Sequence, residues 1–118
     1  MMQLLLVGAG GAAGCMLRYG VQRALHSFYF PLGTLAVNIA GCFFIGLLWA
    51  LFAKGSLPES GRLLLMSGFC GGFTTFSAFT QESLQLLQQA KIGLFFIYVA
   101  ASVTAGLLAT FAGYKLIN

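Results

Sequence analysis

Residues 68–79 read GFCGGFTTFSAF and lie in the middle of an apolar segment that spans about 62–89. Glycine is a weak helix former, so Gly71 and Gly72, followed by Thr74 and Thr75, predict a break in an otherwise helical span. Non-helical backbone at membrane depth survives only where it is buried in protein or lines a cavity. Carbonyls freed between Gly71 and Thr74 would point inward and suit a small cation. The alternative is a kink satisfied by hydroxyl groups and water.

Three further apolar segments accompany this one, at about 2–25, 32–53 and 92–114. Only 7% of the 118 residues are charged and 59% are hydrophobic, whereas a soluble domain is about 25% charged. One bilayer crossing needs about 20 apolar residues, so the length accommodates four helices with short connections. The sequence therefore predicts an all-α, multi-pass membrane protein, and the family resemblance described below implies the cytoplasmic (inner) membrane. We expect one domain over residues 1–118, with four transmembrane helices and the third broken in mid-membrane.

The six basic residues are dispersed near the ends of these segments. Nucleic-acid binding needs a basic patch or stripe, so we expect no nucleic-acid partner, and the flanking charges suit the lipid bilayer interface. One side of the membrane would hold Arg18, Arg23 and Lys91, and the other Lys54, Arg62 and Lys115. An even split removes the bias that sets orientation. We therefore expect dual topology, with two oppositely inserted copies paired as an antiparallel homodimer.

The sequence lacks a catalytic constellation, so an enzyme is not expected. His26 is solitary, and the two carboxylates stand in different segments. An opening glycine-rich motif formally matches a relaxed dinucleotide fingerprint, but no carboxylate follows about 20 residues later, as that site requires. Glycines four residues apart, Gly10 with Gly14 and Gly68 with Gly72, instead predict close packing between helices.

Polar side chains within the apolar segments mark candidate functional positions, because they are costly in lipid. Thr34 and Asn38 are four residues apart, as are Tyr98 and Ser102, so each pair shares one helix face. Ser77 adds a hydroxyl within the motif of the third segment. These residues offer hydroxyl and amide donors. The alternative for Asn38 is a purely structural hydrogen bond to another helix.

Two phenylalanines of the third segment are candidates for contact with an anion. Phe76 and Phe79 are three residues apart and project to nearly one side of a helix. The edges of phenylalanine rings are electropositive, so two stacked rings seen edge-on can contact an anion without supplying a full charge. The alternative is ordinary packing. Arg18 is either a structural anchor near the interface or a positive charge at a pore mouth, and Glu82 is expected near the opposite end of its segment.

The chain resembles the small fluoride channels known as CrcB or Fluc along its whole length. Three stretches carry the likeness: residues 10–19 (GGAAGCMLRY), residues 33–41 (GTLAVNIAG) and, most specifically, residues 68–79. The resemblance implies an antiparallel dual-topology homodimer with two fluoride pathways and a sodium ion at the centre of its interface. By the same likeness Asn38, Phe76 and Phe79 would line a pathway.

The resemblance also implies roles for further residues. Polar neighbours of the pathway would be Thr34, Ser77, Ser102 and Tyr98, and sodium would be held by backbone carbonyls of Gly71 and Thr74 from both copies. Ala78 departs from the family, which often has a hydroxyl residue there. This departure puts part of the polar track in doubt, but not the pathway itself.

The implied function is passive, fluoride-selective export that protects the cell from fluoride toxicity. Amide, hydroxyl and ring-edge groups can replace the water of a small anion without trapping it. Two alternatives stay open. A small multidrug-type, proton-coupled antiporter needs an acidic residue in its first span, and none occurs before Glu59. A non-conducting structural membrane subunit would use its glycines only for packing.

Overall fold

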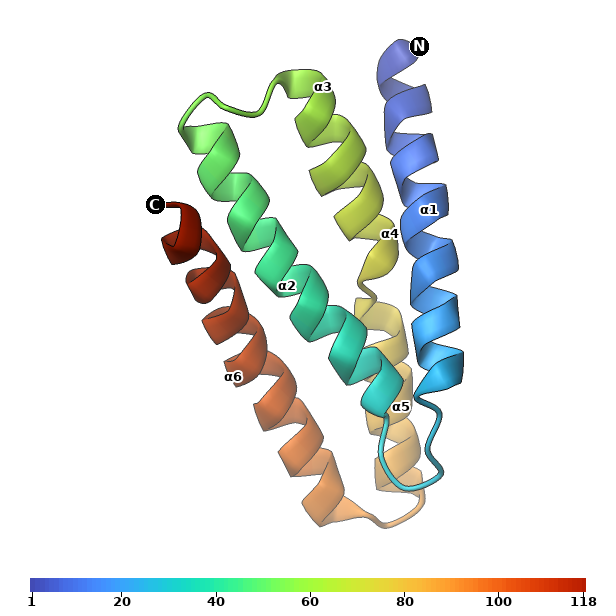
Figure 1. Cartoon of the computed structure of the whole chain (residues 1–118). Helices are drawn as coiled ribbons and strands as arrows, with labels where there is room; N and C mark the ends of the chain where they lie inside the picture. Colours follow the sequence, from blue (N-terminus) through green and yellow to red (C-terminus); the bar gives the residue numbers. More distant parts are fainter.

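The computed structural model describes all 118 residues, which form four long helical segments joined by short loops (Figure 1). Helix α1 spans Met2–Ala24, α2 spans Leu32–Ala53 and α6 spans Ile92–Ile117. The third segment consists of α3 (Glu59–Gly61), the π-helical η1 (Arg62–Cys70), α4 (Gly71–Phe73) and α5 (Phe76–Gln88). All four segments are long and apolar enough to cross a membrane. The prediction of four apolar helices, with the third one interrupted, is confirmed.

Prolines and terminal charges determine where the helices begin and end. Pro31 and Pro58 occupy the N-cap positions of α2 and α3, since proline can precede a helix but not continue one. The third segment therefore begins at Glu59, whose carboxylate suits the positive end of the helix dipole and pairs with Arg62. Helix α6 continues to Ile117, beyond the expected end at 114, and carries Lys115 in its last turn, where a cation is favoured.

Glycines bring α1 into backbone contact with η1 and α4. A Cβ atom at Gly10 or Gly14 would collide with a backbone carbonyl of η1, and one at Gly68 or Gly72 would press on a carbonyl of α1. Small residues allow membrane helices to approach in this way. The close packing predicted from the two glycine pairs is confirmed.

A second helix pair, α2 with α6, also packs through glycines. Gly46 of α2 and Gly113 of α6 each face a backbone carbonyl of the other helix. Each of these glycines stands without a partner four residues away, so the spacing rule did not indicate this contact. The fold therefore consists of two tightly packed helix pairs, and α5 joins α6 at the end of the molecule where the loop 89–91 connects them.

The two ends of the bundle carry similar numbers of basic residues. Both termini lie at the same end as the α2–α3 loop, and the loops 25–31 and 89–91 lie at the opposite end (Figure 1). At the first end Lys54 Nζ donates to the carbonyl of Ile117, at 2.8 Å. Arg23 and Lys91 belong to the other end. The bundle therefore gives the bilayer no strong charge signal for one orientation.

Most of the apolar surface is left uncovered by the chain itself. Only 16 of 118 residues are buried, and large side chains such as Leu107, Leu108 and Phe111 are exposed along α6. Exposed apolar surface on this scale marks contact with a membrane or another protein. The bundle therefore depends on lipid, or on a further subunit, to cover its helices.

Candidate functional site

An open groove of about 400 Å³ lies beside the break in the third segment. It is bounded by the broken segment, α2 and α6. Among its lining residues are Asn38, Gly71, Thr74, Phe76, Phe79 and Ser102. The groove thus gathers most of the residues that the sequence analysis singled out.

Asn38 holds the backbone of the break. Thr74 and Thr75 are extended, with φ and ψ of −93° and 159° for Thr74 and −152° and 113° for Thr75. Asn38 Nδ2 donates to the Thr75 carbonyl at 3.1 Å, and the Thr75 N–H donates to Asn38 Oδ1 at 2.8 Å. The amide of Asn38 therefore replaces helical partners that the break removes. Its nitrogen carries a second hydrogen, which this pair of bonds does not use.

Two carbonyls at the break lose their usual helical donors. In a continuous α-helix the Thr75 N–H would bond the Gly71 carbonyl, and the Ala78 N–H would bond the Thr74 carbonyl. Here the Thr75 N–H turns to Asn38, and the Ala78 N–H donates to Thr75 Oγ1, which caps α5, at 3.1 Å. A Cβ atom at Gly71 would meet nothing within 4 Å. The two carbonyls are thus released from these helical bonds beside an open groove.

The aromatic rings of the groove form a short series. Phe76 and Phe79 have ring centroids 5.6 Å apart and are tilted by 41° rather than stacked. The Phe79 ring also contacts the Tyr98 ring, with 5.1 Å between their centroids. Phe76 is 75% exposed, so its ring is free to meet whatever enters the groove. The spacing of three residues correctly indicated that the two phenylalanines lie together.

Ser102 carries the one buried side-chain polar atom that has no hydrogen-bond partner, its Oγ. Buried polar groups are nearly always paired, and Ser102 lines the groove. Ser102 therefore contributes a buried, unpaired hydroxyl to the wall of the groove. Ser77, in contrast, is exposed and does not line the groove, and its Oγ lies 3.3 Å from Thr75 Oγ1.

Thr34 and Tyr98 lie outside the groove, around Glu82. Thr34 Oγ1 and Tyr98 Oη each donate to the Glu82 carboxylate at 3.0 Å. Both side chains are buried. The four-residue spacings that place Thr34 with Asn38, and Tyr98 with Ser102, therefore do not bring the four side chains to one site. Asn38 and Ser102 line the groove, whereas Thr34 and Tyr98 bond to Glu82.

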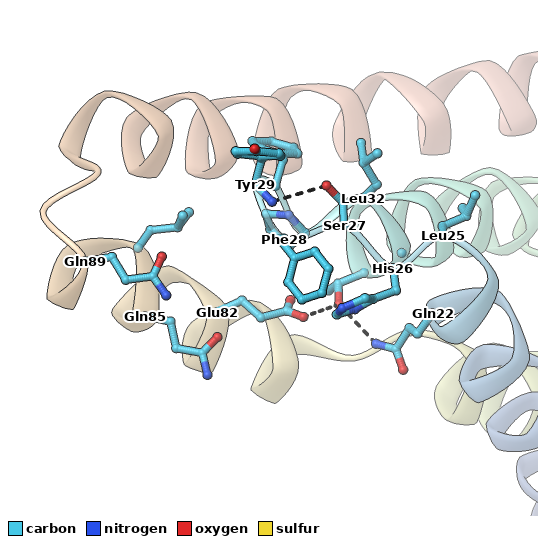
Figure 2. A pocket seen from close by; sticks show the side chains of 15 residues that line it. Gln22, Leu25, His26, Ser27, Phe28, Tyr29, Leu32, Glu82, Gln85 and Gln89 are labelled. Carbon is cyan, nitrogen blue, oxygen red and sulfur yellow. Dashed lines mark hydrogen bonds between the residues drawn. The ribbon is translucent and has the colours of Figure 1, made fainter.

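A polar cavity of about 170 Å³ lies beside Glu82, where the loop 25–31 meets α5 (Figure 2). Gln22 of α1, together with Gln85 and Gln89 near the end of α5, supplies amide groups to its lining. Glu82 lies in the C-terminal half of its segment and is engaged inside the protein. Sequence reasoning missed Gln22, although its position four residues after Arg18 placed the two on one helix face.

Arg18 is bonded within the protein. Its Nε donates to the Gly72 carbonyl at 3.0 Å, and its Nη1 donates to Gln22 Oε1 at 3.1 Å. The guanidinium therefore holds α4 against α1, next to the break. Neither interpretation of the sequence, an interfacial anchor or a charge at a pore mouth, described this contact.

Comparison of the chain with known proteins identifies a family and several close relatives. A family model described as "CrcB-like protein, Camphor Resistance (CrcB)" matches residues 5–114. The fluoride-specific ion channel FluC of Chlorobium phaeobacteroides (strain BS1) is 47% identical over 117 residues, covering 96% of this chain and 91% of that protein. The FluC of Rhizobium etli is 47% identical over 122 residues, covering 100% of this chain and 98% of that protein. The FluC of Thermus thermophilus is 47% identical over 116 residues, with 95% and 91% covered.

Proposed function

The chain belongs to the CrcB/FluC family of fluoride-specific ion channels, and from this premise we propose that the groove beside the break is its fluoride pathway. It is a multi-pass membrane channel and not an enzyme. The proposed physiological role is passive fluoride export, which protects the cell from fluoride toxicity.

The observation that carries the pathway proposal is the unpaired Ser102 hydroxyl in the groove. Fluoride is small and strongly hydrated, and it accepts hydrogen bonds well, so a pathway must replace its water with donors. Ser102 Oγ–H and the second hydrogen of Asn38 Nδ2 are such donors, and the ring edges of Phe76 and Phe79 add electropositive contacts. None of these groups carries a full charge, so fluoride can also leave.

Fluoride efflux from proteoliposomes, recorded with a fluoride electrode, tests the channel and its pathway together. We expect the protein to release fluoride but not chloride. Ser102→Ala is expected to lower the fluoride rate roughly fivefold, because one hydrogen bond is worth about 1 kcal/mol. Ser77→Ala, which removes a hydroxyl outside the groove, is the matched control. Equal release of chloride would contradict the function, and full activity of Ser102→Ala would contradict the pathway.

The same proposal includes an antiparallel homodimer. Its support is the even distribution of basic residues over the two ends, the small buried fraction of a single chain and the openness of the groove on one side. A second copy, inverted by a two-fold axis in the membrane plane, would cover the groove and give two equivalent pathways.

Reporter fusions at the C-terminus test this arrangement. An enzyme active only inside the cell and one active only outside it are each fused after Asn118. Dual topology predicts signal from both fusions, because single chains insert both ways. Signal from one fusion alone would exclude the inverted dimer.

A sodium ion at the dimer interface completes the proposal. The donor set fits, because the carbonyls of Gly71 and Thr74 are released from their usual helical partners and lie at the groove. Hard cations prefer such oxygen ligands, and two copies would contribute four of them. Bound sodium would supply a fixed positive charge that holds the two breaks together.

A further inference from the structure

A continuous series of hydrogen bonds crosses the bundle on the side of Glu82. It begins at the Gly72 carbonyl, passes through Arg18, Gln22 and Thr34, and ends at Glu82, which also accepts from Tyr98. The bonds are 3.0 to 3.1 Å long. The series therefore joins the break, α1, α2, α5 and α6. The side chains of Gln22 and Glu82 reach the Thr34 hydroxyl from opposite sides (Figure 2).

The direction of every bond in this series follows from its two charged ends. Arg18 can only donate, and both Glu82 oxygens accept from hydroxyls. Gln22 must therefore turn its oxygen to Arg18 and its Nε2 to Thr34 Oγ1. Thr34 gives its single hydrogen to Glu82 and accepts from Gln22 through a lone pair. Gln22 thus adds a second hydrogen bond that holds the Thr34 side chain in the rotamer that reaches Glu82.

Glu82 has no cation in direct contact, since the one ion pair of the chain joins Arg62 and Glu59. Its two carboxyl oxygens accept hydrogen bonds from two hydroxyls, those of Thr34 and Tyr98. A polar group inside a membrane protein is costly without such partners. The nearest basic group along the series is Arg18, and Gln22 is the link between them.

Tyr98 connects this series to the groove. Its side chain is completely buried, its hydroxyl donates to Glu82, and its ring lies 5.1 Å from that of Phe79. The position of Tyr98, and with it one side of Phe79, therefore depends on where Glu82 is held. Gln22 itself does not line the groove.

We propose that Gln22 is a positioning residue for fluoride conduction, which acts through Thr34 and Glu82 on Tyr98 beside the pathway. This inference rests on the proposed function of the groove. Without the Gln22 amide, only the bond to Glu82 restrains the Thr34 hydroxyl, and Glu82 is held less firmly beside Tyr98.

A double-mutant cycle in fluoride efflux tests the proposal, because residues that act in one series have non-additive effects. Gln22→Met and Thr34→Val each keep side-chain volume but remove the bond between the two residues. We expect each to lower efflux roughly tenfold, and the double variant to be no slower than either one. Multiplied losses in the double variant, or an unchanged rate in Gln22→Met, would overturn the proposal.

Two further variants separate positioning from general stability. Gln85→Met removes an amide from the same cavity outside the series and is expected to conduct normally. If Gln22→Met failed to assemble while Gln85→Met assembled, Gln22 would be a structural residue and the proposal would be wrong. Gln22→Glu still accepts from Arg18 but has no hydrogen for Thr34, so we expect it to be as slow as Gln22→Met. Recovery of the full rate by Gln22→Glu would assign the effect to Arg18 instead.

Wild-type efflux in the same vesicles distinguishes failure of the proposed channel function from failure of the positioning role of Gln22. Absence of fluoride release from wild-type vesicles would overturn the proposed function itself. Normal wild-type release together with a normal rate for Gln22→Met would overturn only the positioning role.

Discussion

Asn38→Asp is expected to lower fluoride efflux from proteoliposomes by at least about 100-fold. Asn38 Nδ2 donates to the Thr75 carbonyl at 3.1 Å beside the groove. Aspartate has no hydrogen to donate, and it adds a negative charge where an anion must pass. Two unit charges about 4 Å apart at an effective dielectric constant of about 20 interact by about 4 kcal/mol. That repulsion exceeds the roughly 2.7 kcal/mol that corresponds to a 100-fold change in rate.

The control for the added charge is Gln89→Glu, which converts an amide to a carboxylate at an exposed position outside the groove. It is expected to conduct at nearly the wild-type rate. Size-exclusion chromatography in detergent checks that both variants assemble as the parent protein does. A fluoride rate for Asn38→Asp within a factor of three of wild type would show that fluoride does not pass this amide.

The sequence was sufficient for those features of the fold that depend on composition and local spacing. Low charge and segment length predicted four membrane helices, because each crossing must be apolar over its whole length. Glycine pairs four residues apart predicted close packing between helices, which the structure shows between α1 and the η1–α4 stretch. A break was predicted at Gly71, Gly72, Thr74 and Thr75, where helix propensity is weak and hydroxyls offer alternative bonds. In the structure the two glycines stay helical, and only Thr74 and Thr75 are extended.

The partners of polar side chains were less predictable, because they come from other helices. Thr34 and Asn38 share a helix face by spacing, yet Thr34 bonds Glu82 and Asn38 bonds Thr75. A spacing of four residues defines a face, but the angle between helices decides what each end of that face meets. The contact of Gln22 with Thr34 was missed for the same reason, since Thr34 lies on α2, whereas its contact with Arg18 could have been found from their spacing of four residues on α1.

The Thr74 and Thr75 hydroxyls explain how a break can persist in an apolar segment. Thr74 Oγ1 donates to the Cys70 carbonyl at 2.9 Å, which also accepts the Thr74 N–H at 3.0 Å, so the last helical turn before the break has two bonds from Thr74. Thr75 Oγ1 accepts from the Ala78 N–H and starts α5 on the other side. Backbone groups that lack partners in lipid cost several kcal/mol each. Side chains of the break and Asn38 therefore satisfy much of the local backbone and leave the Gly71 and Thr74 carbonyls without their usual helical donors.

Phe79→Ile is expected to lower fluoride efflux roughly 30-fold, equivalent to about 2 kcal/mol in the barrier. Phe79 lines the groove between Phe76 and Tyr98, at centroid distances of 5.6 and 5.1 Å. Isoleucine keeps an apolar side chain but has no electropositive ring edge for an anion to contact. A charge on a desolvated aromatic ring is worth up to about 2 kcal/mol, and we take the anion at the ring edge to be of similar strength.

Phe96→Ile provides the matched control for this change. Phe96 is 62% exposed on α6 and lies outside the groove, so the same loss of a ring there should leave fluoride efflux unchanged. Substitution of Phe79 by tyrosine, which retains a ring edge, should preserve more conduction than isoleucine does. If Phe79→Ile and Phe96→Ile conducted equally well, the ring edge would not contribute to fluoride passage, and the donors of Asn38 and Ser102 would have to replace the water of the ion without it.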